Sequence, residues 1–147
     1  MPPLTQRPTP APTNLVGIGD ALRLSLSFAP DTRRVAYARR VAGALLRERE
    51  FAEDTVQTVE LLVSEIVTNA VVHGRGGRVR FLFAYDGAGD VRIEVDDQSR
   101  ACVKVRPPNA EDETGRGMFL VAALARQWGR RGTRTWCTVA TEGASSP

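Results

Sequence analysis

The chain has 147 residues, 42% of them hydrophobic and 25% charged, which suits a single domain with a packed core. No segment approaches the roughly 18 consecutive apolar residues that a membrane-spanning helix needs. Residues 1–15 lack the apolar region of a secretory signal, so we expect a cytoplasmic protein that does not act at a membrane. Cys102 and Cys137 have no partners at metal-ligand spacing, and neither a disulfide framework nor a zinc site is predicted.

The net charge of +3 comes from 20 basic and 17 acidic residues, and every basic residue except Lys104 is an arginine. The arginines are spread along the chain, apart from an excess over residues 115–141, where no acidic residue occurs. This segment could form a basic face for an anionic ligand, although a solvated face is the simpler interpretation. Direct binding of nucleic acid is therefore not predicted.

The first half of the chain predicts a tail, a strand and a helix. Residues 1–20 are rich in Pro, Thr and small residues, which is typical of a disordered tail. Alternation of Leu and Phe over residues 22–28 predicts a half-buried strand. Pro30 and Asp31 then start a helix with Val35, Ala38, Val41, Ala42 and Leu45 at helical spacing.

A second helix is expected over residues 52–74. Asp54 and Gln57 suggest a capping box at its start, and Gly74 ends it. Its core-facing stripe consists of Val56, Val59, Val63, Ile66, Val67, Ala70 and Val71.

The second half predicts a hairpin, a loop, a helix and a final strand. Residues 79–85 and 91–95 alternate around a glycine-containing turn, as in a β-hairpin. A long loop follows over residues 98–114. A helix that opens with glycine is predicted over residues 115–128. A turn at 129–132 leads to a strand at 133–141, and a polar tail follows at 142–147. The helix should turn inwards Met118, Val121, Leu124 or Ala125, and Trp128. Together, these elements predict one α+β domain over residues 21–141, with helices on one face of a sheet.

The second helix also carries polar residues at four-residue steps, namely Glu65, Asn69 and His73. Each step advances about 6 Å along the helix and turns about 40° past a full turn, so these residues form a gently winding row. Val63 and Ile66 flank the row, which could therefore border a pocket where a carboxylate needs a partner. A simply solvated helix face explains the row equally well.

Two further segments carry weaker signals. Asp97 follows the hairpin, at a strand end where ligand groups are commonly recognised, although most such aspartates form turns. Gly115, Arg116 and Gly117 open the third helix, where bare backbone N–H groups and the helix dipole favour an anion. Neither the Walker pattern nor the dinucleotide-binding fingerprint is present.

In combination, these segments resemble the ATP-binding superfamily of gyrase, histidine kinases, the 90-kilodalton heat-shock chaperone and the mismatch-repair ATPases. Within it, the chain is most similar to the bacterial anti-sigma factor/serine kinase branch over residues 22–140. The resemblance is carried by an asparagine box, "ELLVSEIVTNAVVHG", and by two glycine boxes, "VRIEVDDQS" and "GRGMFLVAALA". It implies a two-layer α/β sandwich in which the helices cover one face of a mixed sheet.

The resemblance implies a role for individual residues. Asn69 matches the ligand of a Mg²⁺ ion held between nucleotide phosphates, and Glu65 matches the general base. Asp97 matches the carboxylate that reads adenine. Ser99 stands where glycine is commoner, and its small size should keep the base pocket open. The second glycine box contributes Gly115, Arg116, Gly117 and Met118 to nucleotide binding, and residues 100–114 match a lid. The adenine-contacting threonine has no single match, because Thr133 and Thr135 flank the aligned Arg134; we assign the contact to Thr135.

The implied function is that of an ATP- and Mg²⁺-dependent anti-sigma factor. Such a protein phosphorylates Ser or Thr of an anti-anti-sigma partner and sequesters a sigma factor, and a homodimer is possible. The alternative is a nucleotide-sensing interaction module that has no kinase activity. A nucleic-acid-binding protein would leave the asparagine box unexplained and would show steep salt dependence.

The arginine-rich first helix and the hairpin are candidate surfaces for partner or dimer contacts. Reversing the charges of Arg39 and Arg40 to Glu should weaken capture of an acidic protein partner, because opposite charges steer and hold such a complex. A pull-down with the sigma factor measures this effect. Unchanged capture would remove the first helix from the candidate surfaces.

Overall fold

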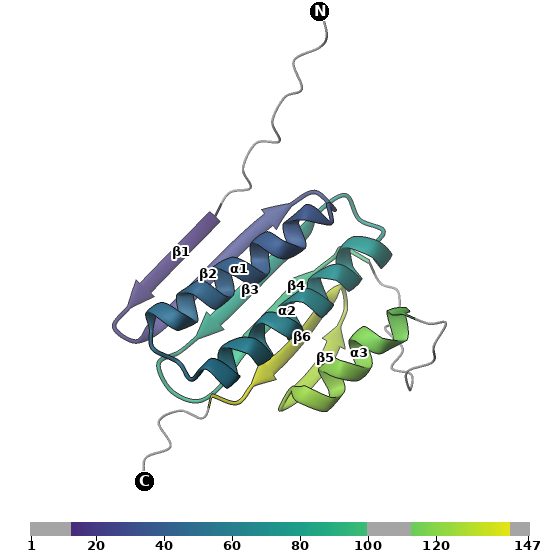
Figure 1. The fold of residues 1–147 in the computed structure, drawn as a ribbon. Coiled ribbons are helices and arrows are strands. Elements are labelled where there is room, and N and C mark those ends of the chain that lie inside the picture. Colours follow the sequence, from purple (N-terminus) through teal and green to yellow (C-terminus); the bar gives the residue numbers. More distant parts are fainter. Residues whose placement is uncertain (1–12, 100–112, 142–147) are drawn as a thin grey trace, which may run out of the picture.

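The computed structural model describes residues 13–99 and 113–141, in which three helices cover one face of a six-stranded sheet (Figure 1). This arrangement confirms the predicted α+β fold with helices on one face. The elements are β1 Thr13–Ile18, β2 Ala21–Phe28, α1 Arg33–Glu48, α2 Glu53–His73, β3 Val79–Tyr85, β4 Val91–Asp96, α3 Glu113–Leu124, β5 Gln127–Arg131 and β6 Arg134–Val139.

The sheet has the strand order β1-β2-β3-β4-β6-β5, and every neighbouring pair in it is antiparallel. The expected mixed sheet is therefore wrong. The antiparallel pairing follows from how the strands are connected. Hairpins join β1 to β2, β3 to β4 and β5 to β6, and hairpins give antiparallel pairs. Between β2 and β3 the chain crosses the sheet twice, through α1 and α2, and so returns in the opposite direction.

Strand β1 lies within the segment that the sequence predicts to be a disordered tail, so that prediction is wrong from Thr13 onwards. Within the described part of the chain β1 is an edge strand that pairs only with β2, in a register that places Leu15 opposite Leu24. Leu15 and Val16 are both more than half exposed, so β1 has no buried face. A strand without a buried face shows no alternating pattern, because no side has to be apolar.

Helix α2 is the central element of the core, and its predicted stripe is confirmed except at Val71, which is only partly buried. Val56, Val59, Val63, Ile66, Val67 and Ala70 are all buried, together with Leu62. Figure 1 shows α1 and α3 on either side of α2, and α2 contacts β3, β4 and β6 beneath it. Gly43 allows α1 to approach closely, since a Cβ there would lie 2.9 Å from Cδ of Glu60.

The predicted capping box at the start of α2 is wrong. The N-cap is Ala52, and no side chain caps the helix. Because the helix starts at Glu53, Asp54 already lies in its first turn. The acidic Glu53 and Asp54 there interact favourably with the positive end of the helix dipole. Glu53 additionally pairs with Arg47 of α1 at 2.7 Å.

The third helix ends earlier than predicted, and the chain then forms the unpredicted strand β5. α3 begins at Glu113, two residues before Gly115, and ends at Leu124. Trp128, expected on the inner face of the helix, instead lies on β5 opposite Cys137 of β6. Pairing with β6 overrides the helical periodicity here, as tertiary context often does in strands. The tight connection to β6 uses Gly132, whose φ of 61° favours glycine.

Two single features refine the expectations on membranes and thiols. By length and composition alone α2 is long and apolar enough to cross a membrane, contrary to the expectation from the sequence. Core helices of other proteins pass the same test, and α2 is a core helix. Cys137 is buried in the core, and its burial raises the pKa of the thiol to about 12. Cys102 lies outside the described residues.

Candidate functional site

The polar row of α2 lies at the border between core and solvent. Glu65 and Asn69 are half-buried on consecutive turns, whereas His73, the last residue of the helix, is exposed. Burial of the neighbouring Ile66 and Val67 fixes the rotation of the helix, so the row can face neither fully inwards nor fully outwards. The structure thus brings Glu65 and Asn69 together and leaves His73 at the rim.

Partial burial has a chemical effect on Glu65. Loss of solvent around its carboxyl group raises the pKa of Glu65 above its ordinary value of 4.5. Among the described residues, neither Glu65 nor Asn69 has a side-chain hydrogen bond or an ion pair. A carboxylate with a raised pKa is a better proton acceptor, and an unengaged amide is free to accept a ligand.

The chain leaving β4 forms two successive turns that point Asp97 inwards. The backbone N–H of Gln98 donates to Asp96 Oδ1, and that of Ser99 donates to Asp97 Oδ1 at 2.8 Å. Gln98 takes a left-handed φ of 59° between them. Asp97 and Ser99 are both buried, at 6% and 4% exposure. Asp97 thus forms an Asx turn, as expected of a strand-terminal aspartate. Unlike most such residues, it is shielded from solvent.

Glycines after α2 bring the helix end against this turn. A Cβ at Gly74 would lie 3.0 Å from Cβ of Asp97, and a Cβ at Gly76 would lie 2.7 Å from the carbonyl oxygen of Asp97. These contacts leave no room for a side chain. Asn69, the predicted Mg²⁺ ligand, lies one turn before the end of this helix. It therefore lies at the same corner of the molecule as Asp97, the predicted adenine-reading residue.

Arg130 of β5 contacts Asp97 and its neighbours, and no sequence motif pointed to this residue. Its Nη2 donates to Asp97 Oδ1 at 3.1 Å and to the carbonyl oxygen of Ser99. Its Nη1 donates to Thr135 Oγ1 at 2.8 Å. The signal that could have revealed it is the pairing of β5 with β6, because Arg130 stands directly opposite Thr135 in that register.

The cluster also separates the three positions considered for the adenine-contacting threonine. Thr135 is buried at 4% exposure and shares Arg130 with Asp97. Arg134 projects from the other side of β6 and pairs loosely with Asp96 at 3.7 Å. Thr133 lies in the turn, where its carbonyl oxygen accepts the backbone N–H of Asp97. Only the hydroxyl of Thr135 is linked to the Asp97 side chain through a shared partner.

The second glycine box is only partly within the described structure. Gly115, Arg116 and Gly117 form part of the first turns of α3, but the side chain of Arg116 lies outside the described part. Met118 is buried in the core. Most of the predicted lid, residues 100–112, also lies outside the described residues. α3 contacts α2, the helix that carries Glu65 and Asn69.

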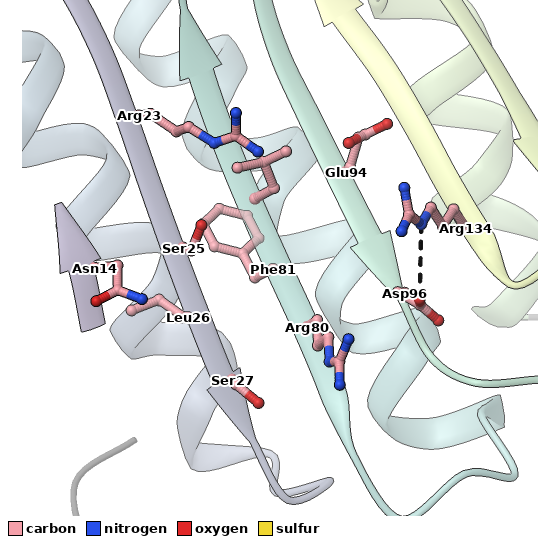
Figure 2. Close-up of a pocket in the computed structure, with 11 residues that line it drawn as sticks. Asn14, Arg23, Ser25, Leu26, Ser27, Arg80, Phe81, Glu94, Asp96 and Arg134 are labelled. Atoms are coloured by element: carbon pink, nitrogen blue, oxygen red, sulfur yellow. Dashed lines mark ion pairs between the residues drawn. The ribbon is translucent and has the colours of Figure 1, made fainter. Parts of the chain in front are cut away.

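A pocket of about 290 Å³ lies elsewhere, on the face of the sheet opposite the helices. Figure 2 shows Arg23, Arg80 and Arg134 around it, with Ser25 and Asn14 beside them. None of the residues that line it belongs to the predicted nucleotide site. The buried carboxylate and the half-buried row of α2 carry a clearer chemical signal than this open hollow, so the corner of Asp97 remains the candidate site.

The raised pKa of Glu65 predicts how stability should change with pH. The fold holds the proton more tightly than the unfolded chain, so Glu65 costs nothing below pH 4.5 and becomes destabilising as the pH rises through its folded-state pKa. Glu65→Gln removes this cost. We expect the melting temperature of the variant, taken relative to that of wild type, to be higher at pH 7 than at pH 4. An equal difference at both pH values, in thermal unfolding followed by circular dichroism, would contradict the assignment.

Comparison with known proteins places this geometry in a family. Residues 28–140 match the model of the histidine kinase-like ATPase domain. The chain is also 33% identical over 78 residues to the anti-sigma F factor of Halalkalibacterium halodurans. That alignment covers 51% of this chain and 53% of the relative, so the chain spans about half the length of the curated protein that it matches. The family match includes α2, the exit of β4 and the strands around Arg130 and Thr135. The chain belongs to the histidine kinase-like ATPase domain family.

Proposed function

We propose that the protein is an ATP-binding anti-sigma factor that phosphorylates Ser or Thr of an anti-anti-sigma partner and sequesters a sigma factor. The observation that carries the proposal is the corner where half-buried Glu65 and Asn69 lie on the helix whose end packs against buried Asp97. Membership of the ATPase family and similarity to an anti-sigma F factor support it. This role would also place the protein in the cytoplasm.

The residues at this corner fit a magnesium nucleotide. The amide oxygen of Asn69, unengaged within the described residues, is a hard neutral ligand of the kind that Mg²⁺ accepts beside phosphates. The buried carboxylate of Asp97 is an acceptor in a site with little water, and so suits the exocyclic amine of adenine. When bound, ATP with Mg²⁺ supplies the phosphoryl group that is transferred.

Each side chain then has a limited task. Asn69 would hold the metal, and the backbone amide of Gly115, in the first turn of α3, would face phosphate, as N–H groups at a helix start do. Asp97 and Thr135 orient the base. Glu65, one turn from Asn69, accepts the proton of the attacking Ser or Thr hydroxyl, and its raised pKa favours that step. Catalysis of phosphoryl transfer consists mainly of such positioning and charge neutralisation.

A second candidate function, nucleotide sensing without phosphoryl transfer, is favoured by one observation. Arg130 already occupies the carboxylate that would read adenine. A site closed in this way could report nucleotide binding through a change in shape, with no chemical step. Glu65 separates the two functions, because a pure sensor has no use for a general base.

Binding of ATP is the first expectation to test. Isothermal titration should show Mg²⁺-dependent binding of ATP to wild type, and Asn69→Ala should weaken it about tenfold or more, since a metal ligand is lost. Asn14→Ala is the matched control, because Asn14 is exposed on β1 and lines the hollow on the opposite face. Equal binding by wild type and Asn69→Ala, or weakening by Asn14→Ala alone, would move the site away from α2.

Glu65→Gln tests the kinase function. The variant should keep ATP affinity but transfer phosphate to a purified anti-anti-sigma protein roughly 100- to 10,000-fold more slowly, as expected for loss of a general base. Transfer of labelled γ-phosphate measures this.

Glu60→Gln is its control, since Glu60 lies on the same helix but pairs with Arg47 at 2.7 Å, away from the site. Unchanged transfer by Glu65→Gln would exclude Glu65 as the base. No transfer by wild type that binds ATP would instead favour the sensor.

A further inference from the structure

The ion pair between Arg130 and Asp97 is the least exposed one among the described residues. The two side chains are 12% and 8% exposed, whereas every other ion pair within the described ranges has at least one side chain more than 40% exposed. Surface ion pairs contribute little to stability, but a charge buried without its partner is strongly unfavourable. Arg130 and Asp97 therefore depend on each other in a way that the surface pairs do not.

The guanidinium group meets the acceptors that a base would need. Asp97 Oδ1 already accepts two donors, the Ser99 N–H at 2.8 Å and Arg130 Nη2 at 3.1 Å. Nη1 faces Asp97 Oδ2 at 3.4 Å and donates to Thr135 at 2.8 Å. The carbonyl oxygen of Ser99 is a further acceptor of the same group. The N–H donors of this one guanidinium group thus contact all three residues that the resemblance assigns to the base pocket, namely Asp97, Ser99 and Thr135.

An exocyclic amine and a guanidinium group are both N–H donors, so they compete for the acceptor sites of Asp97. A carboxylate oxygen that already has two donors cannot accept a third in good geometry. Oδ1 is therefore closed to the base. Arg130 Nη1 lies 3.4 Å from Oδ2, the remaining acceptor, so a base that is read by Oδ2 competes with Arg130 for it. The strand that carries Arg130, β5, is the outermost strand of the described sheet and pairs there only with β6.

We propose that Arg130 is an intramolecular competitor of the nucleotide base: it neutralises Asp97 in the nucleotide-free protein and leaves when the base binds. Arg130 thereby sets nucleotide affinity. The inference rests on the proposed function, since it takes Asp97 as the residue that reads the base. It adds that the free energy of the Arg130–Asp97 pair is subtracted from the free energy of nucleotide binding.

Substitution of Arg130 should therefore tighten binding. Arg130→Gln keeps a side chain of similar reach and one amide donor but loses the charge and the fork. We expect it to bind Mg²⁺-ATP about tenfold more tightly than wild type in isothermal titration, because its competition for Asp97 is weaker. Arg130→Lys keeps the charge without the fork and should have an intermediate affinity.

The matched control is Arg131→Gln, the same substitution at the next, exposed position of β5, which should bind like wild type. Thermal unfolding without nucleotide gives a second readout. Arg130→Gln should melt below both wild type and Arg131→Gln, because Asp97 loses its charged partner. Saturating ATP should then raise its melting temperature by more than it raises that of wild type.

The outcomes are distinguishable. Wild-type or weaker ATP binding by a folded Arg130→Gln variant, beside normal binding by wild type, overturns the role of Arg130 and leaves the proposed function intact. Failure of every variant and of wild type to bind millimolar ATP overturns both. If Arg130→Gln does not fold, Arg130→Lys decides the question alone, and an affinity no higher than that of wild type contradicts the inference.

Discussion

Burial of the apolar face of α2 against the sheet is the constraint on which the rest of the structure depends. A helix with this many buried Val, Ile and Leu side chains can pack in only one rotation, because turning it would expose them to water. That rotation leaves Glu65 and Asn69 at the edge of the core. The partial burial of these two residues, and with it the raised pKa of Glu65, therefore follows from the packing of the core.

A second constraint acts at the end of the same helix. Gly74 and Gly76 let the chain approach the exit of β4 so closely that Asp97 is enclosed. An enclosed carboxylate needs a donor, and the fold provides one in Arg130. Asp97 therefore has its charged partner within the fold. A ligand that hydrogen-bonds to Asp97 competes with the guanidinium group of Arg130. Its affinity therefore depends on β5, a strand that carries none of the predicted ligand contacts.

Sequence patterns located the buried-faced elements well and the others poorly. β2, β3, β4 and the core of α2 have one apolar side, and their alternation or helical spacing is visible along the chain. β1 has no buried face, and β5 follows an apolar helix so closely that Trp128 fits the helical spacing too. Both strands exist because a neighbouring strand offers backbone hydrogen bonds, which leave no trace in the order of side chains.

The same distinction holds for the site. The sequence by itself determined that Glu65 and Asn69 share a helix face and that Asp97 ends a strand, since helical spacing and strand alternation are local properties of the chain. It also determined the resemblance that gave these residues their predicted roles. Only the tertiary structure decided that Arg130 meets Asp97, 33 residues away, and that Thr135 joins them. Which distant side chains meet depends on the register between strands and on the depth of their burial, and both are set by the packing of the whole domain.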